Sequence, residues 1–177
     1  MKDLSKIKLL VCDCDGVLTD GKIVYDSQNS ETKNFSSHDG VGIKILNHTD
    51  IQVAVITGRV SKMLERRCND LSIKHLYQNI QNKKKCLGEL LKNLELSYEN
   101  VAYIGDDWND FPAMQDCFLK IAPQNAQRDF KNTADHVTEN SGGFGAVREA
   151  IEYILKGRNE FDKALKLYID ELLEADL

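Results

Sequence analysis

The chain has 177 residues, of which 42% are hydrophobic and 29% are charged, so it is long and apolar enough for one domain with its own core. Its net charge of −5 at pH 7 argues against a general nucleic-acid-binding or membrane-surface protein. The five cysteines have no zinc-site or Cys-x-x-Cys spacing, which predicts buried thiols in a reducing compartment. Because the sequence shows no signal peptide or membrane-spanning stretch, we expect a cytoplasmic protein.

The first predicted strand, residues 8–12, leads directly into Asp13, Asp15 and Gly16. Residues two apart on a strand point the same way, so the two carboxylates emerge together at the carboxyl end of the strand. Open α/β sheets bind ligands at that edge. Two carboxylates repel each other and are costly to bury unpaired, and such oxygen ligands suit Mg²⁺. The alternative is an ordinary turn, which Asp and Gly also favour.

A β-hairpin is predicted over residues 22–35, because the segments 22–26 and 31–35 flank a turn-rich Ser-Gln-Asn-Ser sequence. An isolated hairpin is marginal in water and needs something to pack on. This flap carries apolar and aromatic side chains that it is too small to bury alone: Ile23, Val24, Tyr25 and Phe35.

The next predicted strand of the sheet, residues 53–56, ends in Thr57, Gly58 and Arg59. A threonine hydroxyl with nearby backbone N–H groups at a helix start can hold a phosphate oxygen. The alternative is an ordinary threonine cap.

A run of three lysines, Lys83, Lys84 and Lys85, opens the helix predicted over residues 83–94. The helix dipole favours anions at that end and opposes lysines. The lysines therefore either serve a bound anion or are simply solvated, and the choice between Lys83 and its neighbours stays open.

A second acidic cluster follows the strand predicted over residues 101–104, where Gly105 precedes Asp106, Asp107 and Asp110. Asp106 and Asp110 are four residues apart and share a face if a helix starts here. Acidic residues in a first turn also complement the helix dipole, which is the alternative. Two acidic clusters, each at the end of an apolar strand, are harder to explain as caps.

The alternation of strands and helices predicts an α/β fold, a Rossmann-like parallel sheet with helices on both faces and no separate cap domain, in a single domain over residues 1–177. The strands are expected at residues 8–12, 53–56, 75–77, 101–104, 118–121 and 136–137. The helices are expected at residues 40–48, 61–71, 83–94, 109–115, 126–131 and 144–156. The tail, residues 158–177, has one apolar helical stripe that packs either on its own domain or on a partner subunit.

The order of these motifs resembles that of the haloacid dehalogenase-like hydrolase superfamily. Its four motifs map onto residues described above: Asp13 and Asp15, Thr57, Lys83, and Asp106, Asp107 and Asp110. The resemblance implies a phosphate-transferring enzyme. In it, Asp13 is the nucleophile that forms an aspartyl-phosphate, and Asp15 is the general acid and base.

The same resemblance implies a Mg²⁺ cofactor. Its ligands would be carboxylates and one backbone carbonyl: Asp13, Asp15 through its carbonyl, Asp106, and Asp107 in support. Thr57 and Lys83 would stabilise charge on the transferred phosphate, and Asp110 would orient Lys83.

Longer stretches resemble the 3-deoxy-D-manno-octulosonate 8-phosphate phosphatase family and together cover nearly the whole chain: residues 12–21, 38–43, 56–59, 75–78 and 142–149. The resemblance implies hydrolysis of that sugar phosphate in lipopolysaccharide precursor synthesis. The candidates for substrate contacts are Arg59, His38, Gly58 and Asp110, and the family usually carries Arg where His38 stands.

Two alternatives to this function stay open. A phosphatase for nonulosonate (sialic-acid-type) 9-phosphates is hard to separate by motif, and a non-catalytic domain that regulates assembly of a partner enzyme belongs to a different class. The Gly-rich residues 142–145 either cradle an anion or form a flexible loop.

The resemblance also implies a homotetramer, because the hairpin is an oligomerisation element in this family. Pairing of hairpins around a symmetry axis would bury their apolar side chains. It would also let each subunit cover its neighbour's site, which no cap domain closes.

Overall fold

The computed structural model describes residues 2–25, 27 and 31–174. Its strands are β1 (Leu9–Cys12), β2 (Val24–Tyr25), β3 (Glu31–Thr32), β4 (Gln52–Ile56), β5 (His75–Tyr77), β6 (Val101–Ile104), β7 (Leu119–Ala122) and β8 (His136–Val137). Its helices are α1 (Ser37–Leu46), α2 (Lys62–Asp70), α3 (Lys83–Asn93), α4 (Phe111–Met114), α5 (Ala146–Gly157) and α6 (Phe161–Glu174).

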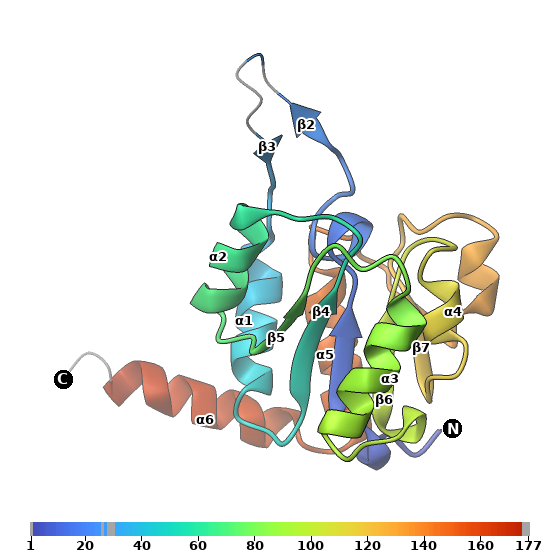
Figure 1. The fold of residues 1–177 in the computed structure, drawn as a ribbon. Helices are drawn as coiled ribbons and strands as arrows, with labels where there is room; N and C mark the ends of the chain where they lie inside the picture. The colour runs from blue at the N-terminus through green and yellow to red at the C-terminus, as the bar shows by residue number, and fades with distance from the viewer. Residues whose placement is uncertain (1, 26, 28–30, 175–177) are drawn as a thin grey trace.

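The central sheet has six strands in the order β5-β4-β1-β6-β7-β8, and every neighbouring pair is parallel. β1 lies in the middle, with Leu9 paired to Gln52 of β4 on one side and to Val101 of β6 on the other. The carboxyl ends of these strands therefore meet at one edge (Figure 1). The predicted α/β fold with a parallel sheet is confirmed.

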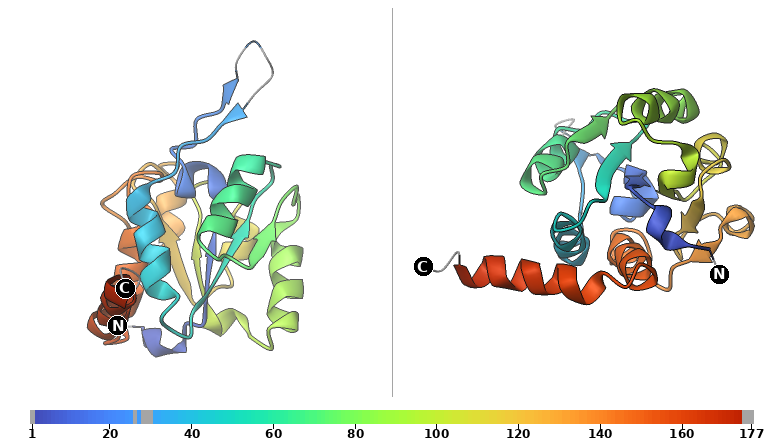
Figure 2. Two further views of the ribbon diagram at one scale, coloured as in Figure 1. Left: turned by 90° about the vertical axis from the view of Figure 1, so that its left-hand side faces the viewer. Right: turned by 90° about the horizontal axis from the view of Figure 1, so that it is seen from below.

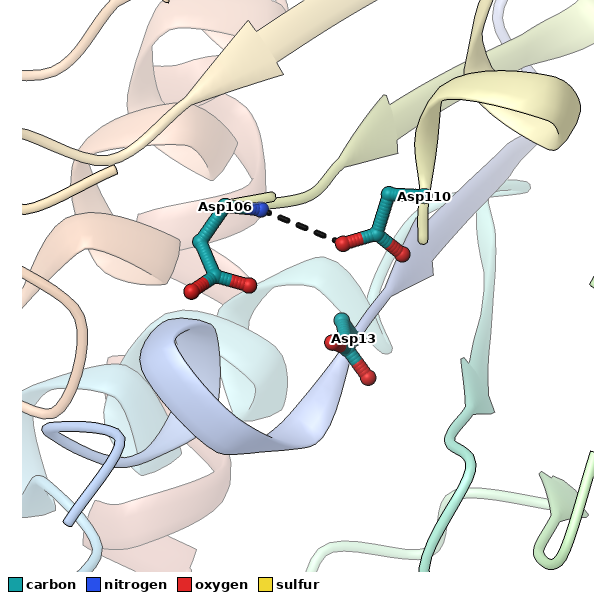
Figure 3. Close-up of side chains that lie close together, drawn as sticks. All are labelled: Asp13, Asp106 and Asp110. Carbon is teal, nitrogen blue, oxygen red and sulfur yellow. Dashed lines mark hydrogen bonds between the residues drawn. The ribbon is translucent and has the colours of Figure 1, made fainter. Parts of the chain in front are cut away.

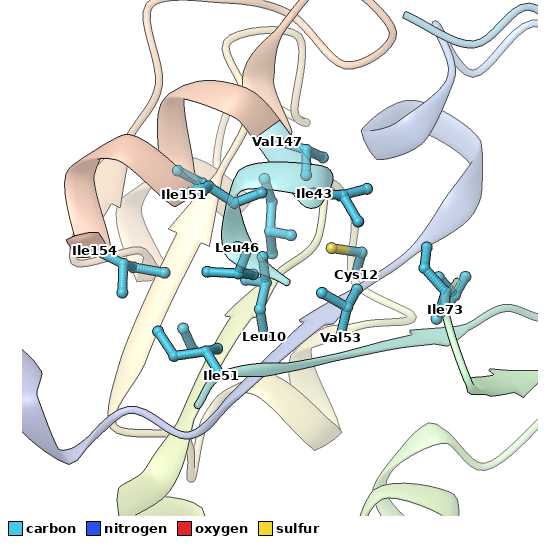
Figure 4. Close-up of a cluster of buried hydrophobic side chains, with 14 of the residues drawn as sticks. Leu10, Cys12, Ile43, Leu46, Ile51, Val53, Ile73, Val147, Ile151 and Ile154 are labelled. Atoms are coloured by element: carbon cyan, nitrogen blue, oxygen red, sulfur yellow. The ribbon is translucent and has the colours of Figure 1, made fainter. Parts of the chain in front are cut away.

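Alternate residues of β1 belong to two cores, one on each face of the sheet, as the period of a strand requires. Leu10 and Cys12 pack with residues of α1 and α5 (Figure 4). Leu9 and Val11 pack on the other face with residues of α3. Helices therefore cover both faces of the sheet (Figure 2), which explains why the central strands β1 and β6 are apolar and buried along their whole length.

The helix predicted over residues 126–131 is wrong. The structure has a short 3₁₀ turn over Phe130–Thr133 instead. The Gln127 side-chain oxygen accepts hydrogen bonds from the backbone amides of Asp129 and Phe130, at 2.7 and 2.9 Å. These side-chain bonds give the amides partners outside a regular helix.

Two other helices have different bounds from those predicted. The helix predicted over residues 109–115 is the four-residue α4, with Pro112 in its first turn, a position that proline tolerates. α1 begins before the predicted residue 40, because the Ser36 side chain caps it by accepting from the Asp39 amide at 3.4 Å.

The predicted hairpin is present, although its ladder is short. Val24 pairs with Thr32 and Tyr25 with Glu31, and the hairpin projects from the carboxyl edge of the sheet (Figure 1). Of the predicted turn and its flanks, residues 26 and 28–30 lie outside the described residues. Ile23, Val24 and Tyr25 are exposed on this flap.

The tail helix α6 packs on its own chain through its first half. Ala164 is buried, and Phe161, Leu165 and Tyr168 pack against the core under α1 and α5. Leu172 and Leu173 are exposed, and residues 175–177 lie outside the described residues.

Within the described part of the chain, no helix combines the length and apolarity needed to cross a membrane.

Candidate active site

Asp13 stands immediately after β1 and is buried, with 4% of its surface exposed. Its Oδ1 accepts a hydrogen bond from the Cys14 amide at 2.7 Å and lies 2.9 Å from the Lys83 ammonium. Both contacts use the same oxygen, so the carboxylate is held in one orientation and Oδ2 is left for other partners.

The turn after Asp13 brings a second acidic motif close. Gly16 has φ +90°, and a Cβ there would lie 2.1 Å from a carboxylate oxygen of Asp106. Glycine is therefore required at this position for two reasons: the positive φ and the close approach of Asp106. The irregular turn Cys14–Leu18 consequently packs directly against the end of β6.

Lys83 is the first residue of α3 and is the lysine of its run that enters the site. Its ammonium lies 2.9 Å from Asp13 and 2.7 Å from Asp110, and its side chain is 2% exposed. Burial disfavours the charge, but the two carboxylates outweigh it and raise the pKa of Lys83. Lys84 and Lys85 instead pair with Asp116 and Glu89 on the surface.

Asp110 is fully buried and fixes both Lys83 and the backbone of Asp106 by hydrogen bonds. Its Oδ1 accepts from Lys83 at 2.7 Å and from the Tyr103 hydroxyl at 2.8 Å, and its Oδ2 accepts from the Asp106 amide at 3.2 Å. A Cβ on Gly105 would lie 2.6 Å from the Asp110 side chain. Asp110 therefore faces protein donors on all sides.

Three carboxylates from two strand ends converge at this point (Figure 3). One oxygen each from Asp13, Asp106 and Asp110 lies within 4.8 Å of the others. Burial and the nearby Asp110 raise the pKa of Asp13 well above its usual range, although Lys83 opposes them. Burial, Asp110 and Asp107 raise the pKa of Asp106 to about 7. The site is thus short of positive charge, and its all-oxygen donors fit a hard divalent cation such as Mg²⁺.

Thr57 and Arg59 approach from the neighbouring strand β4. The Thr57 hydroxyl is buried and accepts from the Arg59 amide at 3.4 Å. The Arg59 side chain reaches the hairpin, donating to the Tyr25 hydroxyl at 3.1 Å and to the Glu31 carboxylate at 3.0 Å. Two chain segments far apart in sequence are thereby joined over the edge of the sheet.

A cleft of about 430 Å³ joins the acidic residues after β1 and β6 to Thr57 and Arg59 after β4. Its lining residues are Asp13, Asp15, Thr57, Gly58, Arg59, Asp106, Asp107, Trp108 and Asn109. Lys83 and Asp110 lie behind this lining. His38 is exposed on the first turn of α1 and is not part of it. A larger cavity of about 680 Å³ is lined by residues that include His48, Gln52 and Tyr168, and by none of the predicted site residues.

Sequence reasoning did not single out Trp108, and it left the role of the Gly-rich loop, residues 142–145, open. Trp108 lines the cleft with its side chain half exposed, and its position between Asp107 and Asn109 was the available signal. The Gly-rich loop packs behind the site, where Gly143 donates to the Val17 carbonyl at 3.1 Å and a Cβ on Gly142 would lie 1.9 Å from the Gly16 carbonyl. The loop therefore supports the turn that carries Asp15.

Comparisons with known proteins agree with this geometry. A family model for haloacid dehalogenase-like hydrolases matches residues 72–151. The 3-deoxy-D-manno-octulosonate 8-phosphate phosphatase of Yersinia pestis is 44% identical over 165 residues, which cover 93% of this chain and 88% of that protein.

Two solved structures share the fold. The Moraxella catarrhalis 3-deoxy-D-manno-octulosonate 8-phosphate phosphatase, in complex with magnesium ion, phosphate ion and the sugar acid, is 39% identical with a TM-score of 0.90, covering 94% of this chain and 95% of that one. The cobalt-bound Haemophilus influenzae phosphatase is 41% identical with a TM-score of 0.86, covering 90% and 94%. This chain therefore belongs to the 3-deoxy-D-manno-octulosonate 8-phosphate phosphatase family of haloacid dehalogenase-like hydrolases.

Proposed function

We propose that this protein is a Mg²⁺-dependent phosphatase that hydrolyses 3-deoxy-D-manno-octulosonate 8-phosphate to the free sugar acid and phosphate in lipopolysaccharide precursor synthesis. The observation that carries the proposal is the position of Asp13, whose carboxylate lies beside Lys83 and Asp106 at the carboxyl edge of the sheet. The relatives named above support the choice of substrate.

The Mg²⁺ ion would be held by Asp13, Asp106 and the backbone carbonyl of Asp15, with Asp107 in support at the cleft wall. When bound, it supplies positive charge that offsets the carboxylates and the substrate phosphate. The close approach of the Asp13, Asp106 and Asp110 carboxylates supports this assignment. Burial and the neighbouring carboxylates raise the pKa values of Asp13 and Asp106, and a divalent cation would offset that negative charge.

Asp13 would attack phosphorus through the oxygen that Lys83 and the Cys14 amide leave free. As the new O–P bond forms, the bond from phosphorus to the sugar oxygen breaks, and Asp15 donates a proton to that oxygen. Asp15 then takes a proton from water, which attacks the aspartyl-phosphate, releases inorganic phosphate and restores Asp13.

The remaining residues would bind and orient the phosphate. Thr57 and Lys83 would stabilise the charge on its oxygens, and Asp110 would position Lys83 through the 2.7 Å contact. Gly58 and Arg59 line the cleft beyond the phosphate position and would contact the sugar acid. His38 has no place in the cleft of its own chain, so its proposed substrate contact would require a neighbouring subunit.

We also propose a cytoplasmic homotetramer. All five cysteines are buried thiols, in keeping with a reducing compartment. The exposed Ile23, Val24 and Tyr25 supply the apolar surface that hairpin pairing between subunits would bury. Light scattering tests this, and a fully active monomer would contradict it.

The function is tested by phosphate release from a panel of sugar phosphates. With Mg²⁺, kcat/KM for 3-deoxy-D-manno-octulosonate 8-phosphate should exceed that for a nonulosonate 9-phosphate and for glucose 6-phosphate by about a hundredfold. The opposite preference for the 9-phosphate would identify the alternative phosphatase. Absence of any phosphate release with Mg²⁺ would instead support a non-catalytic domain.

A further inference from the structure

The base of the hairpin is linked to the cleft by a basic side chain that the mechanism above does not use. Lys33, which follows β3, forms an ion pair with Oδ1 of Asp15. Its ammonium also lies 3.8 Å from Glu31. The flap is therefore attached directly to the residue that would transfer the proton.

The burial of the Lys33 side chain argues against a direct role in substrate binding. Its side chain is 2% exposed, although it belongs to a flap whose tip is open to solvent. Lys22, on the other arm of the same hairpin, pairs with Asp20 and is 78% exposed. A side chain as covered as that of Lys33 has no free surface to offer a sugar, so its contact with Asp15 is its main interaction.

The geometry of Asp15 shows what this contact does. Lys33 engages Oδ1, whereas Oδ2 lies 3.8 Å from Nε of Arg59, which is too long for a hydrogen bond. Arg59 itself is held by Glu31 and Tyr25 of the hairpin. One carboxylate oxygen of Asp15 is thus fixed, and the other is left without a close cationic partner at the cleft.

We propose that Lys33 is a positioning residue that holds the Asp15 carboxylate in the orientation needed for proton transfer to the leaving oxygen. The proposal rests on the phosphatase function proposed above. In this step Asp15 starts as the carboxylic acid, protonated on Oδ2. When the bond from phosphorus to the sugar oxygen breaks, the electron pair stays on that oxygen, the Oδ2 proton neutralises it, and Asp15 becomes the carboxylate that pairs with Lys33. Because its side chain is covered, Lys33 would contact neither the sugar nor phosphorus and would act through Asp15.

The test compares two leaving groups in the full-length protein with Mg²⁺. kcat/KM includes every step up to departure of the leaving group, and p-nitrophenolate leaves without needing a proton, whereas a sugar alkoxide needs one. Lys33→Met should therefore lower kcat/KM for 3-deoxy-D-manno-octulosonate 8-phosphate by about tenfold or more, and that for p-nitrophenyl phosphate by less than about threefold. Lys33→Arg, which keeps the charge, should recover much of the loss. An equal loss for both substrates, or no loss for either, would overturn the proposal.

Two further variants make the result specific. Lys22→Met removes an exposed lysine from the same hairpin and should leave the ratio of the two kcat/KM values unchanged. In an Asp15→Asn background, Lys33→Met should lower kcat/KM for the sugar phosphate by less than about twofold, because the residue it positions is already lost. A full additional loss in that background would show that Lys33 acts independently of Asp15, even if the single variant is less stable.

Failure of the proposed function gives a different result. A wild-type protein that prefers another alkyl phosphate would refute the substrate assignment, and the comparison of alkyl and aryl leaving groups would then be made with that alkyl phosphate.

Discussion

Two clusters of charged side chains lie at the cleft, and they differ in how deeply the chain buries them. Around Lys83, the side chains of Asp13, Lys83 and Asp110 are 6%, 2% and 0% exposed. At the hairpin base, Asp15, Glu31 and Arg59 keep 19%, 17% and 36% of their side chains exposed, whereas Lys33 is 2% exposed. The first cluster is enclosed by strand ends and α3, whereas the second joins the sheet edge to a projecting flap.

The difference in burial predicts different consequences for the two clusters. Removing one partner from a buried cluster leaves an uncompensated charge in a medium of low polarity, which destabilises the fold. Water screens a partly exposed cluster, so losing one ion pair there costs little stability. Changes around Lys83 should therefore affect stability and catalysis together, whereas changes at the partly exposed Glu31 and Arg59 of the hairpin base should mainly affect catalysis.

The largest effect is expected at Asp13. Asp13→Asn should fold but lose at least about three orders of magnitude in kcat, roughly 4 kcal/mol of barrier, because an amide cannot form the acyl phosphate. Steady-state phosphate release with circular dichroism checks both parts. Near-normal turnover in protein shown to be free of wild-type enzyme would refute the covalent mechanism.

Lys83→Met should combine both effects of the buried cluster. It leaves Asp13 and Asp110 facing each other without a cation, so unfolding free energy should fall by about 3 kcal/mol and kcat by about a hundredfold. Urea unfolding and phosphate release measure the two. Lys84→Met is the matched control, because Lys84 is 45% exposed and pairs with Asp116 on the surface, and it should change stability by less than about 0.5 kcal/mol.

The unfolding free energy of the metal-free protein should depend on pH because of the same buried carboxylates. The pKa of Asp106 is raised to about 7 in the folded state against about 3.9 in the unfolded chain. Between these values the folded state binds a proton that the unfolded state has released, so unfolding free energy falls as pH rises. Because Mg²⁺ displaces that proton, it should raise the melting temperature more at pH 8 than at pH 5.

Calorimetry with and without Mg²⁺ at the two pH values checks this dependence. Asp106→Asn should reduce the slope of the metal-free protein, and the raised pKa of Asp13 accounts for the slope that remains. A metal-free melting temperature that rises from pH 5 to pH 8 would contradict the prediction.

The smallest effect on stability is expected at Glu31. Glu31→Gln weakens the hold on Arg59 and should change unfolding free energy by less than about 1 kcal/mol. It should lower kcat/KM for the sugar phosphate by about threefold, because Arg59 becomes less ordered. Glu99→Gln, which removes a surface ion pair with Lys6, is the control and should leave kcat/KM unchanged. A loss of stability as large as that of Lys83→Met would remove the distinction between the two clusters.

Local patterns in the sequence were sufficient for the strands and for the residues at their ends. The strands β1, β4 and β6 are mostly apolar runs; Asp13 and Thr57 directly follow two of them, and Asp106 follows the third after Gly105. Parallel strands place their carboxyl ends at one edge, so the edge that carries the site could be predicted from a parallel sheet and the residue types at its strand ends. The helix predicted over residues 126–131 was wrong because the Gln127 side chain competes for the backbone amides there.

Tertiary structure decided which charged side chains act together. Nothing in a run of three lysines distinguishes Lys83 by itself, and only the family resemblance pointed to it; in the structure, packing buries it between Asp13 and Asp110. The pairing of Lys33 with Asp15 and the position of His38 outside the cleft likewise depend on how the hairpin and α1 leave the sheet. Contacts between residues far apart in sequence depend on how whole elements pack, and local periodicity does not encode that packing.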